Sequence, residues 1–271
     1  MGAGPERLME SGLIDRLQQA GHEVVACSVC LPSQRFIPEV QAAFELDRRL
    51  AGCVAEAVAA EALPVVLSGN CITSVGTVAG IGEPDLGVIW LDAHGDFNTP
   101  ETTRGGFLDG MALAILTGRC WTSLAATVPG FAPVAERRVM LFGARDLDAQ
   151  EAAALIESEI EHLTPNAISV GLNENLARRK EHTREIYLHI DLDSLDPSEG
   201  KANGFSVDGG FSVSDVRSLI DEAAGAFRIR GVALTAYDPS QDDDGRACDA
   251  AIDLVVSAVN AASRGKDSTP G

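Results

Sequence analysis

Short apolar runs alternate along the chain with longer segments whose apolar residues recur at helical spacing. The apolar runs are continuous, which is typical of strands buried on both faces of a parallel sheet. The expected strands cover residues 22–27, 64–67, 86–91, 138–142, 184–190 and 229–236. The expected helices cover residues 6–20, 38–62, 74–81, 149–158, 173–179, 214–224 and 248–263. Ser214 is expected to be the N-cap of its helix.

This alternation predicts an α/β fold with a mainly parallel, doubly wound sheet. No internal repeat and no linker rich in Pro, Gly and Ser interrupts the pattern, so residues 1–271 are expected to form a single domain. Ligands of such sheets bind beyond the carboxyl ends of the strands, and the functional residues are expected there.

The composition excludes several classes of protein. Hydrophobic residues make up 45% of the 271 residues and charged residues 23%, which predicts a folded core. The formal net charge of −19 argues against nucleic acid and anionic membranes as partners, but it would attract a cationic substrate. There is no signal-peptide pattern and no apolar run of the roughly 18 residues that a membrane helix needs. A cytoplasmic location is expected, with Cys27 and Cys30 as reduced core residues at the end of the first strand.

Metal-binding groups follow two of the expected strands. The run 86–91 leads into Asp92, His94 and Asp96, and the run 184–190 leads into Asp191 and Asp193. With a side-chain period of two, the members of each set should point to the same side. Such charges are costly in a half-buried cleft, whereas carboxylates with an imidazole suit divalent cations, Mn²⁺ above all. The pattern predicts a two-metal hydrolytic site; the alternative is that the acids cap solvated turns.

The sequence around these residues resembles the arginase and agmatinase (ureohydrolase) family. WLDAHGDFNTPETTRGG, starting at Trp90, resembles one family signature, and HIDLDSLDPS, starting at His189, resembles another. SGNCITSVGTVAG falls where the family has a Gly-Gly-Asp-His-Ser stretch, and GARDLDAQE is similar to the arginase segment that holds the amino end of the substrate. The resemblance implies a three-layer α/β/α sandwich with two Mn²⁺ ions.

The resemblance also implies a role for each metal-binding candidate. Asp92 and Asp191 would bridge the two ions, and Asp96 would bind the first ion. His94 and Asp193 would bind the second ion. The neighbouring His189 is expected to point to the other side of its strand and to pack rather than bind metal.

Four further positions match those that hold an amino-acid substrate in arginases. Asn98 and Thr103 match residues that bind the α-carboxylate, and Asp148 and Glu151 match residues that bind the α-amino group. This set favours an amino acid over agmatine, which has no α-carboxylate.

Three departures from the family pattern shape the expected function. Cys71 stands where the family has a histidine ligand; as a thiolate it can bind metal, and the alternative is an inert buried thiol. Asp109 stands where arginases have a histidine proposed to shuttle protons, and a carboxylate could take over that role. Ala236 stands where the family has a glutamate that pairs with the guanidinium, so a fully cationic group would lack its partner.

A conserved metal site beside altered guanidine contacts indicates a changed substrate. The expected substrate is N-hydroxy-L-arginine, whose electron-withdrawing hydroxyl lowers the basicity of the guanidine. Asp96 and Asp109 would carry the proton transfers, and the products would be L-ornithine and hydroxyurea. In these features the chain resembles the N-hydroxy-L-arginine amidinohydrolases of D-cycloserine biosynthesis.

Other functions fit the sequence less well. An arginase or another ureohydrolase is the alternative within the same fold. A metal-binding but non-catalytic family member and a two-metal deacetylase are alternatives from other classes, although the chain has no His-His pair of the kind that such deacetylases use. The chain ends soon after its last expected helix, without the long tail that stabilises some family trimers, so a monomer is expected.

Overall fold

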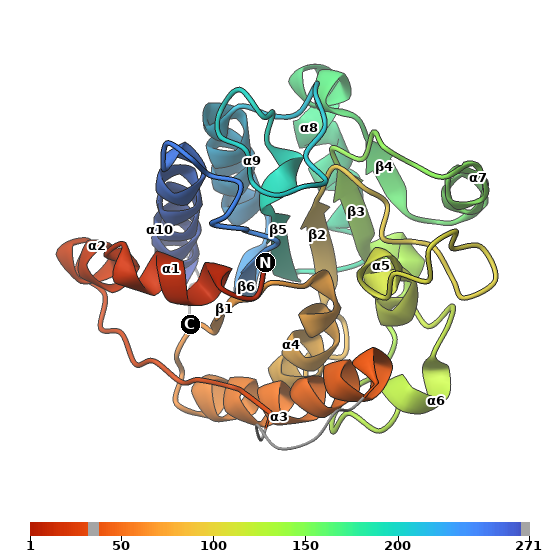
Figure 1. Cartoon of the computed structure of the whole chain (residues 1–271), viewed down its shortest axis with the longest axis horizontal. Helices are drawn as coiled ribbons and strands as arrows, with labels where there is room; N and C mark the ends of the chain where they lie inside the picture. Colours follow the sequence, from red (N-terminus) through yellow and green to blue (C-terminus); the bar gives the residue numbers. More distant parts are fainter. Residues whose placement is uncertain (32–37, 267–271) are drawn as a thin grey trace.

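The computed structural model describes residues 1–31 and 38–266, and within them a six-stranded sheet forms the centre of the molecule (Figure 1). The strands are β1 (Val65–Leu67), β2 (Gly87–Leu91), β3 (Val139–Phe142), β4 (Glu161–Leu163), β5 (Glu185–Asp191) and β6 (Arg228–Thr235). They are arranged in the order β1-β6-β5-β2-β3-β4, and every pair is parallel. The expected parallel, doubly wound sheet is therefore confirmed.

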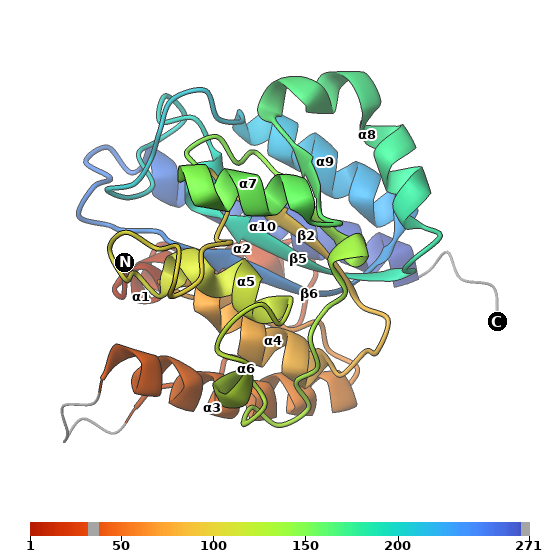
Figure 2. The same cartoon turned by 90° about the vertical axis from the view of Figure 1, so that its right-hand side faces the viewer.

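Helices cover both faces of this sheet, as Figure 2 shows. They are α1 (Gly4–Glu10), α2 (Leu13–Gln19), α3 (Glu39–Ala59), α4 (Ser74–Ile81), α5 (Ala112–Leu116), α6 (Thr122–Ala125), α7 (Ala149–Glu157), α8 (Pro165–Arg179), α9 (Val213–Ala226) and α10 (Arg246–Lys266). Side chains of α1, α2, α8, α9 and α10 share one hydrophobic core, and those of α3 to α7 share the other. The strands alternate between the cores, so that Ile89 and Leu91 face the first while Val88 and Trp90 face the second. The three-layer α/β/α arrangement is thereby confirmed.

Two glycines of α4 allow this helix to pack closely against α3. A Cβ on Gly80 would lie 2.5 Å from Cβ of Val54, and a Cβ on Gly76 would lie 2.6 Å from the backbone oxygen of Asp47. The N–H of Gly76 donates to Asp47 Oδ1 over 3.1 Å. Because α4 follows directly on the turn that carries Cys71, this packing anchors that turn.

The amino-terminal part departs most from the sequence expectations. Residues 22–27 form no strand, and Cys27 and Cys30 are exposed rather than part of the core. The expected helix 6–20 is divided into α1 and α2 at Gly12, whose φ of 92° is left-handed. A glycine adopts this conformation readily, which explains why the helical pattern continues while the helix does not.

Smaller differences occur at other element boundaries. The N-cap of α9 is Ser212 instead of Ser214: the Ser212 side chain accepts from the backbone N–H of Asp215, and the Asp215 carboxylate accepts from that of Ser212, as in a capping box. The short edge strand β4 has no counterpart among the expected strands. No helix in the described ranges has the length and apolar character needed to cross a membrane.

Candidate metal centre and active-site pocket

Two neighbouring strands in the middle of the sheet bring the metal-binding candidates together. Leu91 of β2 pairs with Ile190 of β5, so Asp92 and Asp191 follow at the same edge of the sheet. The chain moves outward from β2 to β3 and β4 in one direction and from β5 to β6 in the other. The site thus lies where the strand order reverses, which is the usual ligand position in open α/β sheets.

The carboxylates of Asp92 and Asp191 are oriented by hydrogen bonds from their surroundings. Asp92 Oδ1 accepts from the backbone N–H of His94 over 2.8 Å, and Asp92 Oδ2 accepts from Trp90 Nε1 over 3.0 Å. Asp191 Oδ1 accepts from the backbone N–H of Asp193 over 2.9 Å. Both side chains are almost fully buried, so their positions are set before any ligand arrives.

His94 lies between two of these acids. Its Nδ1 is 3.3 Å from Asp92 Oδ1 and 3.5 Å from Asp193 Oδ2, and one ligand atom from each of the three residues lies within 4.8 Å of the others. Burial acts against charge on both groups, but their hydrogen bond raises the pKa of His94 and lowers that of Asp193 to about 2. A divalent cation could take the place of the shared proton, so this group could hold an ion.

Asn203 supports this group, and sequence reasoning did not single it out. Its Nδ2 donates to Asp193 Oδ2 over 3.1 Å and to the backbone oxygen of Ala236 over 2.8 Å, while its Oδ1 accepts from the backbone N–H of Phe205. It therefore orients a candidate ligand, as residues that surround metal sites commonly do. Only its position beyond the second signature could have indicated this role.

Cys71 is buried next to Asp191. Its thiol donates to Asp191 Oδ2 over 3.0 Å and lies 3.2 Å from Thr235 Oγ1. Burial first, and then the charge of Asp191, raise the pKa of the thiol well above its usual value. Cys71, Asp92 and His189 form a second group whose ligand atoms lie within 4.8 Å of one another. A cation bound there would favour the thiolate.

His189 does not point away from Asp191, which corrects the sequence expectation. Residues two apart on a strand face the same side, and the His189 ring stacks on Trp90 with centroids 3.6 Å apart. Its Nδ1 lies 2.9 Å from Tyr187 Oη and its Nε2 lies 3.3 Å from Thr235 Oγ1. Burial lowers its pKa to about 3, so the ring is neutral and packed beneath the acids.

Asp96 provides the clearest sign that the site is built for a cation. Its Oδ2 is buried and has no hydrogen-bond partner among the described residues. Burial first, and then the charges of Asp92 and Asp109, raise its pKa well above the usual value. A buried carboxylate oxygen without a partner is costly, and a metal ion would satisfy it. Asp96 reaches the site because its φ of 47° turns the chain, not because the strand continues.

The surrounding charges fit the same interpretation. Burial raises the pKa of Asp92 and Asp191, and neighbouring carboxylates raise it further. No lysine or arginine is among the described residues that line the cavity. The nearby guanidinium of Arg145 donates instead to backbone oxygens, including those of Asp193 and Val207. The buried acids Asp92, Asp96, Asp191 and Asp193 outnumber His94, the basic side chain in contact with two of them, and this excess of acid matches two divalent cations better than it matches an empty cleft.

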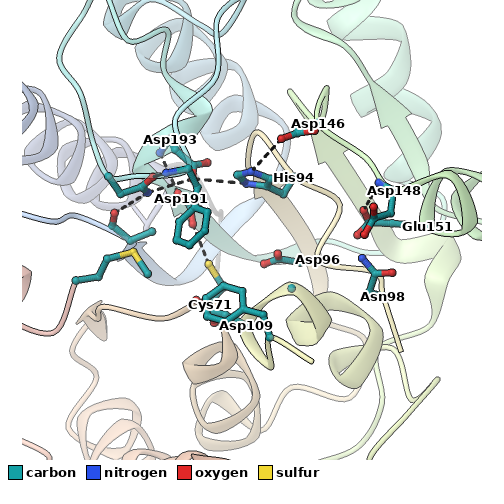
Figure 3. Close-up of a pocket in the computed structure, with 16 residues that line it drawn as sticks. Cys71, His94, Asp96, Asn98, Asp109, Asp146, Asp148, Glu151, Asp191 and Asp193 are labelled. Carbon is teal, nitrogen blue, oxygen red and sulfur yellow. Dashed lines mark hydrogen bonds and ion pairs between the residues drawn. The ribbon is translucent and has the colours of Figure 1, made fainter. Parts of the chain in front are cut away.

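The acids open into a cavity of about 210 Å³ (Figure 3). Asn98, Asp148 and Glu151 line its other end, but Thr103 is not among the lining residues. The Thr103 hydroxyl accepts from the backbone N–H of Gly106 over 3.1 Å. The structure therefore gathers three of the expected substrate-binding residues around a space that suits a small molecule.

Glu151 has a structural task beside its expected one. Its Oε1 accepts from the backbone N–H of Phe97 over 2.9 Å, and its Oε2 accepts from that of Asp148 over 3.3 Å. Asp148 is the N-cap of α7 and lies 3.2 Å from Nε of Arg104. Glu151 thus connects the start of α7 to the loop after β2 and fixes the position of these two segments relative to each other.

Asp109 lines the cavity on the side of Cys71. Its Oδ1 accepts from the backbone N–H of Ile72 over 2.9 Å, and its Oδ2 accepts from Asn70 Nδ2 over 3.0 Å. Burial raises its pKa to about 6 despite these hydrogen bonds. Asp109 could therefore exchange a proton near neutral pH while it supports the turn that holds Cys71.

Two aromatic side chains at the pocket were not anticipated. Phe107 and Phe205 are 42% and 51% exposed, yet their rings stack with centroids 5.6 Å apart. Phe205 also meets His94 edge-on, with centroids 6.4 Å apart. Ala236 completes this part of the lining in a left-handed conformation with φ of 62°. Loop geometry places these residues, which explains why no sequence pattern marked them.

Comparison with known proteins identifies the family of this chain. A family model described as the arginase family matches residues 4–260. The chain belongs to the arginase family. An arginase from Bacillus caldovelox is 30% identical over 271 aligned residues, which cover 94% of this chain and 90% of the relative. The solved arginase from Bacillus cereus has a TM-score of 0.86 at 28% identity and covers 95% of this chain and 91% of that one.

A more distant neighbour shares the fold alone. The agmatine ureohydrolase of Thermoplasma volcanium has a TM-score of 0.66 at 17% identity, covering 96% of this chain and 85% of that one. Members of the arginase family are hydrolases that act on guanidino groups and depend on two metal ions, typically Mn²⁺. The two groups of close donor atoms in the described residues agree with that dependence.

Proposed function

We propose that this arginase-family hydrolase cleaves the guanidino group of N-hydroxy-L-arginine to give L-ornithine and hydroxyurea, as the amidinohydrolases of D-cycloserine biosynthesis do. The observation that carries the proposal is the contrast within one pocket. The acid cluster and three of the four expected substrate-binding residues line the cavity, whereas Ala236 offers no charge at the position where the family resemblance implies a glutamate for the guanidinium. Hydrolysis of L-arginine to urea is the alternative function of the same site.

The proposed cofactor is a pair of Mn²⁺ ions. Asp92 and Asp191 would bind both ions, and Cys71, whose thiol contacts Asp191, would complete the first site together with Asp96. When bound, two such ions would lower the pKa of a water between them and so supply a nucleophile near neutral pH. The unpartnered Oδ2 of Asp96 and the carboxylate-rich donor set support this assignment. His94 and Asp193 would bind the second ion.

The chain's own residues would orient the substrate. Asp148 and Glu151 would receive the α-ammonium group, and Asn98 would donate its amide to the α-carboxylate. Asn98 Oδ1 already accepts from Thr102 Oγ1 over 2.9 Å, which directs the amide nitrogen away from that neighbour. An amino acid held at this end would extend its side chain toward Asp96 and Asp109.

The aromatic pair supports the choice of a less basic guanidine. Phe107 and Phe205 give the pocket an apolar wall, and Ala236 adds no charge to it. A guanidinium pressed against this wall would lose water without gaining an ion pair, which is costly. The N-hydroxyl lowers guanidine basicity, so N-hydroxy-L-arginine can enter nearer to neutrality. Its planar group can also lie against a ring face.

Asp96 and Asp109 are the proposed proton carriers. Both are buried at the cavity, and burial raises the pKa of Asp109 to about 6. Asp96 would pass a proton to the departing nitrogen of ornithine, and Asp109 would exchange it with solvent. A positioned acid of this kind typically contributes about 10²–10⁴-fold to a rate.

The deciding experiment measures the amine released by the purified, Mn²⁺-loaded protein, which is ornithine from either amino acid and putrescine from agmatine. N-hydroxy-L-arginine and L-arginine are supplied at equal concentrations, with agmatine as a control that lacks the α-carboxylate. We expect strong release from the hydroxylated substrate, weak release from L-arginine, and no hydrolysis of agmatine. Release from L-arginine that equals or exceeds that from its hydroxylated form would assign the chain as an arginase. Metal binding without turnover of any of the three would refute the proposal.

A further inference from the structure

Two thiols far from the acid cluster lie in contact. Cys27 Sγ and Cys53 Sγ are 3.1 Å apart, although the residues are separated by 26 positions in the chain. Cys53 lies on α3, and Cys27 lies on the connection that leads from α2 to α3 (Figure 1). Neither residue lines the cavity of the candidate active site.

The two sulfur atoms differ in accessibility. Cys27 is exposed, whereas Cys53 is partly buried. Cys30 is also exposed, and its backbone oxygen accepts a hydrogen bond from Arg49 Nη1 over 2.9 Å. The exposed Cys27 can therefore react with a small oxidant from solvent, and Cys53 lies in contact with it.

The surrounding backbone allows the sulfur atoms to approach further. A disulfide requires a separation of about 2.05 Å, so the gap must close by roughly 1 Å. Residues 23–31 make no backbone–backbone hydrogen bond to another described residue, whereas Cys53 is held in the long helix α3. The connection can shift by this amount without breaking regular secondary structure.

We propose that Cys27 and Cys53 form a reversible redox pair, which a peroxide converts to a disulfide and a small thiol restores. In the first step the Cys27 thiolate attacks the peroxide oxygen, forming a sulfenic acid and releasing one water after proton uptake. In the second step the Cys53 sulfur attacks Cys27, forming the S–S bond and releasing a second water. Two thiols lose two electrons and two protons, and hydrogen peroxide is reduced to two waters.

The order of the steps follows from the environment of each sulfur. The hydrogen bond to Cys27, together with burial, raises the pKa of Cys53 to about 11. Cys53 is also the less accessible of the two sulfur atoms, so the exposed Cys27 meets the oxidant first and Cys53 reacts second. The sulfenic acid at Cys27 is the intermediate that Cys53 resolves.

The bond would join two layers of the molecule. α1 and α2 pack in the core that contains α10, whereas α3 belongs to the core on the opposite face of the sheet. α1 approaches the loop after β6 so closely that a Cβ added to Gly4 would overlap the backbone oxygen of Tyr237. A crosslink at Cys53 would tie the connection between these layers to α3 and oppose its detachment.

The test compares the full-length wild type with Cys27→Ser, Cys53→Ser and the matched control Cys30→Ser. Each protein is treated with hydrogen peroxide, alkylated without reduction, digested and analysed by mass spectrometry. We expect a crosslinked peptide pair containing Cys27 and Cys53 in the wild type and in Cys30→Ser, and its disappearance after dithiothreitol. Thermal unfolding of the oxidised wild type should shift upward by roughly 5–10 °C, with no shift in either partner variant.

Three results would overturn the proposal. They are a Cys27–Cys30 bond in the wild type, over-oxidation of Cys27 to the sulfinic acid without a crosslink, and alkylation of both thiols after peroxide treatment. The peptide analysis of the wild type decides among them even if a serine variant folds poorly. Activity toward guanidino compounds plays no part in this readout, so the outcome is independent of the proposed function.

Discussion

Asp109 accepts a hydrogen bond from the backbone N–H of Ile72 over 2.9 Å, and so the proposed proton carrier also supports the turn beside Cys71. The same carboxylate accepts from Asn70 on the other side of that turn. The proposed proton transfer and the position of Cys71 therefore depend on the same side chain. A variant of Asp109 has to be assayed for both turnover and metal content to distinguish the two effects.

Replacing this carboxylate by an amide should reduce turnover. Asp109→Asn keeps an oxygen for Ile72 but cannot exchange a proton, so kcat should fall by about 10²–10⁴-fold while ornithine binding is retained. Asp208→Asn is the matched control, because Asp208 is an exposed carboxylate that is not among the residues lining the cavity. Metal content is measured for both variants. A kcat close to that of the wild type would exclude Asp109 as the proton carrier.

Replacing the thiol should weaken one of the two proposed metal sites. Cys71→Ser should reduce affinity for one ion by on the order of 100-fold or more, since even supporting residues contribute 10–100-fold. In the Co²⁺-substituted wild type, a thiolate ligand would add a charge-transfer absorption band that the variant lacks. Cys120→Ser, at another buried thiol, is the control. A Co²⁺ spectrum unaffected by Cys71→Ser would mean that Cys71 is an inert core thiol.

Restoring the family's acid should change the substrate preference. Ala236→Glu would place a carboxylate in the pocket, and a desolvated ion pair should raise kcat/KM for L-arginine relative to N-hydroxy-L-arginine by about tenfold. Ala236 already adopts φ of 62°, so the longer side chain adds little backbone strain beyond what alanine has. Competition between the two substrates measures the ratio. An unchanged ratio would show that residue 236 does not select between them.

The aromatic wall formed by Phe107 and Phe205 should affect binding of the guanidine end of the substrate but not of its amino-acid end. Phe205→Ala removes the ring that stacks on Phe107, so KM for N-hydroxy-L-arginine should rise several-fold. Inhibition by L-ornithine, which lacks the guanidine, should stay the same. Val25→Ala is the control, since Val25 is an exposed apolar residue outside the pocket. Equal weakening of both ligands would point to general disruption of the pocket.

A buried acid in α3 should make stability depend on pH. Burial raises the pKa of Asp47 well above its usual value, so the folded state binds this proton more tightly than the unfolded state. The resulting stabilisation is present below about pH 4 and is lost as pH rises toward the raised pKa. Asp47→Asn keeps an acceptor for Gly76 and should increase stability at neutral pH by about 1–3 kcal/mol.

Denaturant unfolding of both proteins between pH 4 and pH 8 measures this effect. The difference between variant and wild type should grow as pH rises. If the two curves run parallel, or if the variant is less stable at pH 7, then Asp47 is charged and paired in a way that the hydrogen bond to Gly76 does not account for.

The positions of the central strands and of the acids after them could be predicted, because burial on both faces of the sheet requires a continuous apolar run in the sequence. β2 is entirely buried, β5 is buried from Ile186 onward, and the register of the two strands brings the acids together without any loop information. The run 22–27 carries the same apolar signal, yet its Val25 is 89% exposed and it joins no strand. Local composition does not reveal whether the sheet has a free edge for such a run.

The other features that the sequence did not predict lie in a short edge strand and in loops. β4 lies at the sheet edge and spans three residues, one of them His162, so it lacks an apolar run. Thr103 and Phe205 depend on how irregular segments turn, and neither segment has a periodic pattern. The direction of His189 was predictable in principle, because a period of two places it on the side of Asp191.

The stack of Trp90 on His189 gives the molecule an internal optical reporter. Trp90 is fully buried and its indole nitrogen donates to Asp92, one of the proposed bridging ligands. Charge arriving at that carboxylate changes the field on the indole ring, and the only other tryptophan, Trp121, is the N-cap of α6 and is not among the residues that line the cavity. The tryptophan emission of the unlabelled protein should therefore follow cation binding in real time, and Trp121→Phe would leave Trp90 as the single tryptophan.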